Sequence, residues 1–276
     1  MASAQETSRS PTRPSLARLA ALVALALLNL ARVASAAPTV ASAAPTVAFS
    51  AKVLPIPGFP HTGNILGAGA DLAFAYEIGG SEYFGSPPPI IAINVYAPKG
   101  TVLHRRGFPT CAEATILDVG AIGCPEGSSA GLGTVVGFVT IGGERVEEAG
   151  QLFVFFGPGG GTEYLADGHS PVSLEILTKG HFSHLGGIDG YGFEEEEEVP
   201  LVATLPGAPY ASVKTISGTF GAAMRAHGRT VYYGRVPRRC PQGGFPLKTE
   251  VTFAEDGEPS RPETVDAYYR TPCPAR

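Results

Sequence analysis

The chain lacks several residue types on which particular functions depend. Its 276 residues include no tryptophan and only two methionines, and charged residues make up 16% of them. The absence of tryptophan weakens the case for a carbohydrate-binding protein, because sugar faces usually stack on large aromatic rings, although ten tyrosines are present. The chain is 44% hydrophobic, which is enough to build the core of one large β domain or two small ones.

Long helices are disfavoured throughout. The sequence has 36 glycines and 25 prolines, and inside a helix glycine costs about 1 kcal/mol and proline about 3 kcal/mol relative to alanine. This composition favours short strands joined by many turns. We therefore predict an all-β fold, an antiparallel β-sandwich with one short helix and two disulfides, with two tandem small β lobes as the alternative.

Residues 1–36 have the three parts of a secretory signal peptide. Three arginines precede a short apolar run, Leu19–Leu28, which is shorter than the roughly 20 residues that a bilayer-spanning helix needs. Ala34-Ser35-Ala36 then matches the A-x-A cleavage pattern. The alternative is an uncleaved anchor helix, in which Asn29 and Arg32 would be poorly accommodated. The pattern predicts cleavage and secretion by the general secretory pathway.

A repeat follows the first cleavage site. The heptapeptide VASAAPT at 33–39 recurs at 40–46, so Ala41-Ser42-Ala43 is a second possible site. We predict a disordered low-complexity segment at 37–45 and the β domain at 46–276. No cysteine lies near the cleavage sites and no apolar tail ends the chain, so we expect no lipid anchor and no stable membrane anchor after cleavage.

Cleavage changes the charge balance. Removing residues 1–36 takes away four arginines and one glutamate, so 16 basic and 24 acidic residues remain and the formal net charge changes from −5 to −8. An acidic protein is a poor match for nucleic acid, which is bound through dense basic patches. The densest basic run, Arg225–Arg239, has Thr230, Val231 and Tyr233 interleaved at strand spacing, which indicates a solvated strand face.

All four cysteines lie in the exported part of the chain. An even number in an oxidising compartment predicts two disulfides, and we favour Cys111–Cys124 with Cys240–Cys273, because each pair closes a short loop. Each closure is expected to contribute about 2–4 kcal/mol. The rival interpretation, a zinc site of four thiolates, needs C-x2-C spacing, and the spacings of 13 and 33 residues do not supply it.

Alternation of apolar and polar residues marks the strands, most clearly in Leu247–Phe253, where the apolar side chains fall on every second position. Thr110 and Glu113 have capping-box spacing, which predicts a short helix over Ala112–Val119. The strands predicted in this way are 46–53, 70–78, 90–97, 134–141, 151–157, 172–178, 199–204, 212–219, 230–236, 246–254 and 263–270.

Two turn phrases recur along the chain. Gly-Phe-Pro occurs at 58–60, 107–109 and 244–246, and Cys-Pro-x-Gly at 124–127 and 240–243. The repetition is consistent with an old duplication into two lobes, or with the same turn chemistry used more than once, since glycine and proline favour the same turns anywhere.

These phrases also belong to a set of segments that resembles a protein family. Together with Gly142-Gly-Glu-Arg-Val146, Gly168-His-Ser-Pro-Val-Ser-Leu-Glu-Ile176 and Tyr232-Tyr-Gly-Arg-Val-Pro-Arg-Arg-Cys240, they resemble a family of exported actinobacterial proteins of unknown function. The likeness covers roughly residues 89–276. It implies an actinobacterial origin and secretion, and it supplies no catalytic or binding residues.

Two glycine-rich motifs resemble functional loops. Gly127-Ser128-Ser129-Ala130-Gly131 matches the G-x-S-x-G nucleophile elbow, but it follows a Cys-Pro turn and precedes a predicted strand, so a small-residue loop is favoured over a catalytic Ser129. Gly157-Pro-Gly-Gly-Gly161 lacks the lysine and the helix of a phosphate-binding loop, which favours a hairpin turn.

Two clusters could bind a cation. His169, His181, Glu163 and Asp167, with His184 and Glu175 nearby, are the candidates for a divalent metal, although surface-loop histidines are the simpler interpretation and we predict no metal site. Glu194–Glu198 offers oxygen ligands to calcium, but five like charges in a row are more typical of a solvated loop.

These observations favour a secreted extracellular or cell-envelope protein, a binding or structural β module without catalysis and without a cofactor. Its expected partner is an extracellular ligand or a cell-wall component, and not nucleic acid. The alternative is a secreted serine or metal-dependent hydrolase using Ser129 or the histidine and carboxylate cluster at 163–184.

Overall fold

The computed structural model describes residues 42–59 and 66–273. The predicted signal peptide, with its cleavage residues Ala34 and Ala36, lies outside these residues. The described part confirms an all-β fold built from antiparallel strands, with a single short α-helix and two disulfides.

The described elements are almost all strands. The strands of the main sheet are β1 (Thr46–Leu54), β2 (Asp71–Gly79), β3 (Ile90–Pro98), β5 (Ser129–Ile141), β6 (Glu144–Phe156), β7 (Thr162–Gly168), β8 (Leu174–His184), β9 (Tyr191–Glu198), β10 (Ser212–Phe220), β14 (Phe245–Ala254) and β15 (Pro262–Thr271). The remaining elements are β4 (Val102–Leu103), α2 (Glu113–Val119), β11 (Ala223–Ala226), β12 (Arg229–Tyr232), β13 (Gly234–Arg235) and the 3-10 turns η1 (Ala121–Gly123), η2 (Pro158–Gly160), η3 (Ile188–Gly190) and η4 (Glu255–Gly257).

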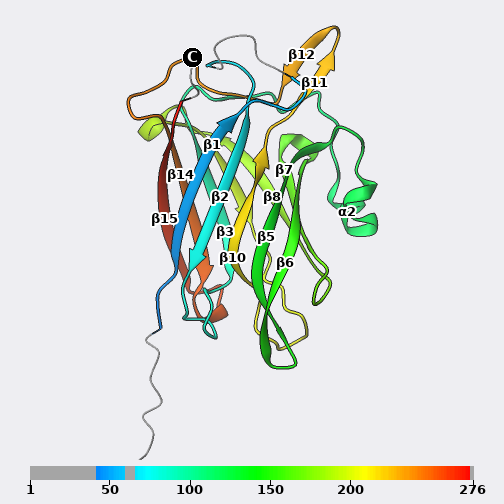
Figure 1. Ribbon diagram of the computed structural model, residues 1–276, viewed down its shortest axis with the longest axis vertical. Helices are drawn as coiled ribbons and strands as arrows, with labels where there is room; N and C mark the ends of the chain where they lie inside the picture. The colour runs from blue at the N-terminus through cyan, green and yellow to red at the C-terminus, as the bar shows by residue number, and fades with distance from the viewer. Residues whose placement is uncertain (1–41, 60–65, 274–276) are drawn as a thin grey trace, which may run out of the picture. The chain divides into compact units, whose positions relative to one another are not determined.

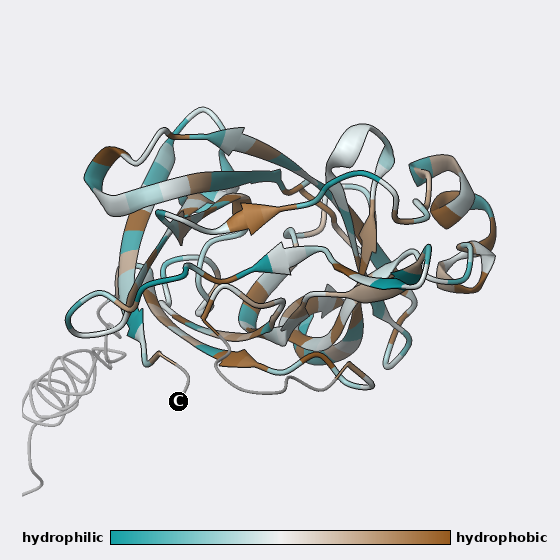
Figure 2. Ribbon diagram, turned by 90° about the horizontal axis from the view of Figure 1, so that it is seen from above, coloured by the Kyte–Doolittle hydropathy of each residue, from teal (hydrophilic) through white to brown (hydrophobic). Residues whose placement is uncertain are grey.

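Eleven described strands form one antiparallel sheet in the order β1-β2-β10-β5-β6-β7-β8-β9-β3-β14-β15. The sheet curls until its edge strands β1 and β15 pack against each other, where the rings of Phe49 and Tyr269 lie 6.3 Å apart. In Figure 1, β1, β2, β10, β5 and β6 lie side by side in front of β3 and β14. Seen from above in Figure 2, the strands surround an elongated interior.

The two layers of the predicted sandwich are therefore two parts of one sheet. The alternative of two tandem lobes is wrong, because strands from the two halves of the chain interleave. Strand β10 pairs with both β2 and β5, and β3 pairs with both β9 and β14. A duplication into separate lobes would leave each half with its own sheet.

Most predicted strands are present, and the differences have physical causes. The segment 199–204 is not a strand beyond one bridging residue, because Pro200, two positions after the last residue of β9, has no N–H to donate to a neighbouring strand. The predicted strand 230–236 is divided between β12 and β13. Strands β7 and β9 were not predicted, since their sequences TEYLADG and YGFEEEEE are rich in charge and lack alternation of hydrophobic residues.

The predicted helix is present as α2, but its capping differs from the prediction. The N-cap is Ala112, with no side-chain cap, so Thr110 does not close a capping box with Glu113. The helix ends at Gly120, whose positive φ of 71° suits glycine and whose N–H donates to the carbonyl of Ile116. Ile116 is buried against Phe155 of β6 and Leu165 of β7, so α2 packs on the outer face of the sheet.

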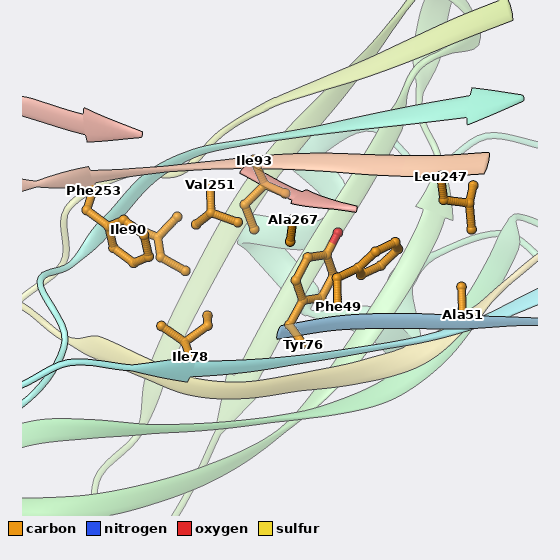
Figure 3. Packing of buried hydrophobic residues seen from close by; sticks show 10 residues of the cluster. All are labelled: Phe49, Ala51, Tyr76, Ile78, Ile90, Ile93, Leu247, Val251, Phe253 and Ala267. Atoms are coloured by element: carbon orange, nitrogen blue, oxygen red, sulfur yellow. The ribbon is translucent and has the colours of Figure 1, made fainter. Parts of the chain in front are cut away.

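The main hydrophobic cluster fills one part of the interior. Strand β14 shows the predicted alternation, with Leu247, Val251 and Phe253 buried and Lys248 and Glu250 outside. Opposing strands close over it, as Figure 3 shows for the ten residues Phe49, Ala51, Tyr76, Ile78, Ile90, Ile93, Leu247, Val251, Phe253 and Ala267. The interior is therefore formed by the inward positions of strands far apart in sequence.

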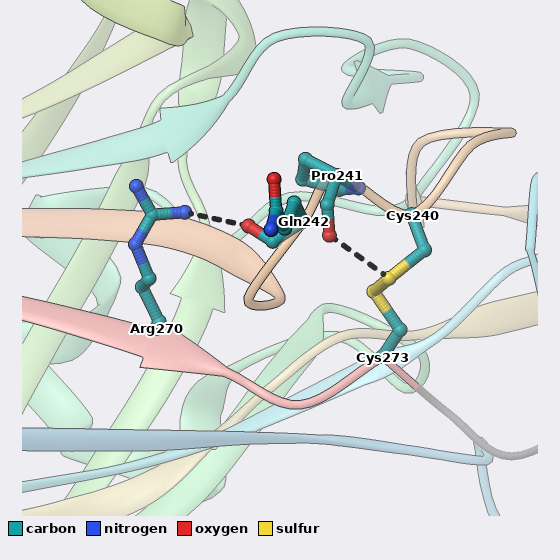
Figure 4. The surroundings of a disulfide bond; sticks show 5 residues. All are labelled: Cys240, Pro241, Gln242, Arg270 and Cys273. Carbon is teal, nitrogen blue, oxygen red and sulfur yellow. Dashed lines mark hydrogen bonds between the residues drawn. A yellow bond between two sulfur atoms is a disulfide. The ribbon is translucent and has the colours of Figure 1, made fainter.

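The predicted disulfide pairing is confirmed. Cys111–Cys124 brackets α2, with the two Cα atoms 5.1 Å apart, and Cys240–Cys273 joins the segments that flank β14 and β15, with a Cα separation of 6.0 Å. Beside the second disulfide, Arg270 donates a hydrogen bond to the carbonyl of Gln242 (Figure 4). Both bridges thus hold loops against the ends or the outer face of the sheet.

Replacing Phe253 by alanine tests the contribution of this cluster. Phe253 is completely buried, so Phe253→Ala is expected to lower the free energy of unfolding by about 3–5 kcal/mol. Tyr268→Ala on β15, where the side chain is 66% exposed, is the matched control and is expected to cost no more than about 1 kcal/mol. Urea denaturation measures both. Equal losses would show that the interior packing does not dominate stability.

Candidate functional site

The glutamate run 194–198 belongs to a strand within the sheet, not to a solvated loop as predicted. Strand β9 pairs on one side with β3 and on the other with β8. Because successive side chains of a strand point to opposite faces, Glu196 and Glu198 are exposed while Glu195 and Glu197 are buried in the interior. The run is therefore split between two faces and does not gather its carboxylates around one cation.

Glu195 is held by two hydroxyl donors from β7. Thr162 Oγ1 donates to Glu195 Oε1 over 2.5 Å, and the Tyr164 hydroxyl donates to the same oxygen over 2.8 Å. All three side chains are buried. Two donors on one buried carboxyl oxygen fix the orientation of this side chain in an otherwise apolar interior.

A glycine makes this contact possible. Strand β8 lies between β7 and β9 in the sheet, and its residue Gly180 lies directly beneath the contact. A Cβ atom on Gly180 would come within 2.5 Å of Glu195 Oε1 and 2.1 Å of Thr162 Oγ1. The missing side chain on the middle strand thus lets Glu195 reach across to β7.

Burial makes both carboxyl groups weak acids. Desolvation raises the pKa of Glu195 to about 7, against the lowering effect of the hydrogen bonds from Thr162 and Tyr164. Desolvation, and then the charge of Glu195, raises the pKa of Glu197 well above its ordinary value. Burial thus favours the protonated form of both carboxyl groups, and the two acids, being close together, disfavour each other's ionisation.

Three phenols complete the polar lining. Desolvation raises the pKa values of Tyr76, Tyr164 and Tyr233, so their hydroxyl groups stay protonated and can donate hydrogen bonds. The Tyr76 hydroxyl donates to Thr249 Oγ1 over 3.3 Å. The buried Tyr233 hydroxyl has no hydrogen-bond partner among the described residues. The interior therefore offers uncharged donors beside the two glutamates.

Two adjoining cavities occupy the interior, each of about 130 Å³. Both are lined by Glu195, Leu72, Val95 and Phe220, and Glu197 lines the second one as well. Their other walls are mainly apolar. Asp71 lines the first cavity, where burial raises its pKa to about 6. An apolar chamber with a few convergent polar groups is the usual form of a small-molecule site.

The metal-ligand candidates do not converge. Glu163 and Asp167 lie four residues apart on β7, which separates them by about 13 Å along the strand. His169 Nε2 lies 3.0 Å from Asp167 Oδ1, whereas His181 is exposed on the outer face of β8. Within the described ranges no group of three or more histidine, cysteine, aspartate or glutamate side chains is arranged to hold a metal ion.

The serine motif also lies outside any strand-turn-helix context. Ser128 is buried and donates from its hydroxyl to the carbonyl of Pro125. Ser129 is exposed and begins β5, a strand of 13 residues, where a nucleophile elbow would continue into a helix. The glycines at 157–161 form the predicted connection between β6 and β7, through the turn η2.

Sequence reasoning missed the interior glutamates because their neighbours are also glutamates. A period-two pattern is visible only when inward and outward positions differ in polarity, and the run 194–198 gives the same residue at both. One signal was present. The run directly follows Tyr191-Gly-Phe193 and precedes Val199, and apolar flanks of this kind are typical of a strand.

Comparisons with known proteins leave the site to be interpreted from its own geometry. No family model matches the chain, and no curated protein or solved structure matches it either. In the ranges 42–59 and 66–273, no helix is both long enough and apolar enough to cross a bilayer.

Titration of Glu195 predicts a pH-dependent stability. Its pKa is about 7 when folded and about 4.5 in an ordinary environment, so the folded state binds more protons between these pH values. The contribution of Glu195 to the free energy of unfolding is therefore fully present below about pH 4.5 and is lost as the pH rises through about 7. Glu195→Gln keeps an acceptor for Thr162 and removes the charge, so the variant should be more stable than the wild type at pH 8 by about 3 kcal/mol.

Denaturation curves between pH 4 and pH 8 measure this difference. Glu196→Gln, on the exposed face of the same strand, is the matched control and should keep the wild-type pH dependence. If Glu195→Gln and Glu196→Gln change the pH dependence equally, the buried carboxyl is not responsible for it.

Proposed function

We propose that this protein is a secreted binding module that holds a small, mainly apolar ligand in the interior of its curled sheet. The observation that carries the proposal is the pair of adjoining cavities beside Glu195. The ligand belongs to the extracellular or cell-envelope environment, and binding requires no catalysis.

The energetic cost of the cavities supports a functional role. Protein interiors are normally close-packed, and voids cost about 24 cal/mol per Å³. At that rate each cavity of about 130 Å³ costs roughly 3 kcal/mol, a large part of a typical folding stability. A ligand that filled this space would recover the lost contacts.

The polar groups of the interior define what such a ligand presents. Burial favours the protonated form of Glu197 and keeps the phenols of Tyr76 and Tyr164 neutral, so these three groups offer hydrogen bonds while adding little charge beside an apolar molecule. Glu195 and the unpartnered hydroxyl of Tyr233 can each exchange a hydrogen bond with a hydroxyl or carbonyl group on the ligand.

The compartment is part of the proposal. The two disulfides indicate an oxidising environment of the extracellular type, and the sequence pattern of residues 1–36 supplies the export signal. The likeness to exported actinobacterial proteins is consistent with secretion. A cell-wall component is one source of an apolar or amphipathic ligand.

Filling the cavity should abolish ligand binding. Val95 lines both cavities, so Val95→Phe is expected to weaken binding of decan-1-ol, a neutral apolar probe, at least about tenfold, a change of about 1.4 kcal/mol. Ala48→Phe places the same side chain on the exposed face of β1 and should leave affinity unchanged. Isothermal titration calorimetry measures both, with thermal melts to confirm folding. Failure of the wild-type protein to bind decan-1-ol would refute the proposal.

The proposed secretion predicts the residue at which the mature protein begins. The backbone of Ala43 makes two hydrogen bonds with Ser81: the Ala43 N–H donates to Ser81 Oγ, and the Ala43 carbonyl accepts from the Ser81 N–H, each over 2.9 Å. Cleavage after Ala36 keeps these bonds, whereas cleavage after Ala43 removes that residue. We expect N-terminal sequencing of protein recovered from the medium to begin at Ala37. Recovery of the uncleaved chain from the cell pellet alone would contradict secretion.

A further inference from the structure

A second feature lies beside the interior, where residues 99–104 meet the segment that follows β12. An open cleft of about 550 Å³ is lined by Lys99, His104, Arg235, Arg238 and Arg239, together with small and apolar residues. Among the described residues, no carboxylate lines it. In a chain with a formal net charge of −5, four permanent positive charges around one cleft are a marked local concentration.

These cations are not neutralised by the described protein. None of the described ion pairs includes Lys99, Arg235, Arg238 or Arg239. The Nε atom of Arg235 is buried and has no hydrogen-bond partner among the described residues. Charges kept unpaired and close together repel one another, and an anion is the ligand that would relieve the repulsion.

The backbone holds the basic segment in place. Arg235 of β13 pairs with Val102 of β4, and the carbonyl of Pro237 accepts a hydrogen bond from Gly67. Next to Arg239, Cys240 is linked to Cys273 (Figure 4). The cleft is therefore built on a fixed segment, which reduces the ordering cost of binding.

The cleft adjoins the apolar interior. Arg235, Val236 and Pro237 line both the cleft and the first cavity. On the neighbouring strand β4, Val102 lines the cleft and Leu103 lines the cavity. The small sheet of β4 and β13 is thus the shared wall at which a basic, solvent-exposed cleft adjoins an apolar chamber.

We propose that the ligand is a single-chain amphiphile with an anionic head group, whose head binds in the basic cleft and whose apolar chain occupies the two cavities. This inference rests on the proposed function and specifies the chemistry of its ligand. Guanidinium groups bind carboxylates and phosphates through paired hydrogen bonds, and Arg235 stands where head and chain would join. An engineered cavity of about 150 Å³ holds benzene, so two cavities of this size suit a chain of roughly ten carbons.

From the sequence, the basic run Arg225–Arg239 was interpreted as a solvated strand face. That interpretation fits Arg225 and Arg229, which are exposed on the hairpin of β11 and β12. It does not fit Arg235, Arg238 and Arg239, which share the cleft. The fold separates one run of arginines into two groups, and only one of them lines the cleft.

Calorimetric titration with four probes tests the inference. The wild-type protein is expected to bind decyl phosphate at least about tenfold more tightly than decan-1-ol, and decylammonium more weakly than either. Inorganic phosphate alone should bind far more weakly than decyl phosphate, because it makes no use of the cavities. The preference for decyl phosphate should shrink as salt is added.

A charge-reversal variant locates the head group. Arg238→Glu with Arg239→Glu alters two exposed side chains and is expected to lose at least about tenfold in affinity for decyl phosphate while keeping its affinity for decan-1-ol. Lys52→Glu with Arg229→Glu makes the same change in net charge at exposed positions of β1 and β12 and should bind both probes as the wild type does.

Each of the remaining outcomes would overturn a specific part of the proposal. Equal binding of decan-1-ol and decyl phosphate by the wild type would overturn the anionic head group and leave the proposed apolar binding intact. Equal loss in the two double variants would show a general charge effect and overturn the cleft. Inorganic phosphate binding as tightly as decyl phosphate would overturn the amphiphile, and failure of every decyl probe to bind would overturn the proposed function itself.

Discussion

The structure depends on one constraint, the alternation of side chains across a single antiparallel sheet that curls until its edges meet. In a curled sheet every inward position faces the same enclosed space, whichever part of the chain supplies it. Strand β14 contributes Val251 and Phe253 to that space, and β2 contributes Tyr76 from 175 residues earlier than Val251. The core, the cavities and the buried glutamates are all consequences of which residues fall on inward positions.

Strand β9 shows how this constraint creates a site. Its glutamates would be unremarkable in a loop, but pairing with β3 and β8 forces every second one inward. Glu195 is then stabilised by the hydroxyls of Thr162 and Tyr164, which reach it over the bare backbone of Gly180. Burial without a cationic partner among the described ion pairs favours the protonated carboxyl, and this keeps a largely apolar chamber compatible with two acidic residues.

The arrangement also relates the two charged features of the molecule. The acids lie inside, where desolvation opposes their charge, and the arginines line the adjoining cleft, where Arg238 and Arg239 are exposed to solvent. An anionic amphiphile matches this order from head to chain, whereas a cationic one would meet repulsion in the cleft. The proposed function and its ligand class therefore follow from the position of the charges, not from their number.

Much of the architecture followed from the sequence alone. The content of glycine and proline excluded long helices, the alternation in Leu247–Phe253 set which side of β14 is buried, and cysteine spacing gave the pairing of Cys111 with Cys124 and of Cys240 with Cys273. These properties are local, because a turn, a strand face or a short loop closure depends on residues close in sequence. The site is not local. Only the tertiary structure places Glu195 beside Thr162, divides the arginines between a hairpin and a cleft, and sets that cleft beside an apolar interior, because each of these depends on strands brought together across the closed sheet.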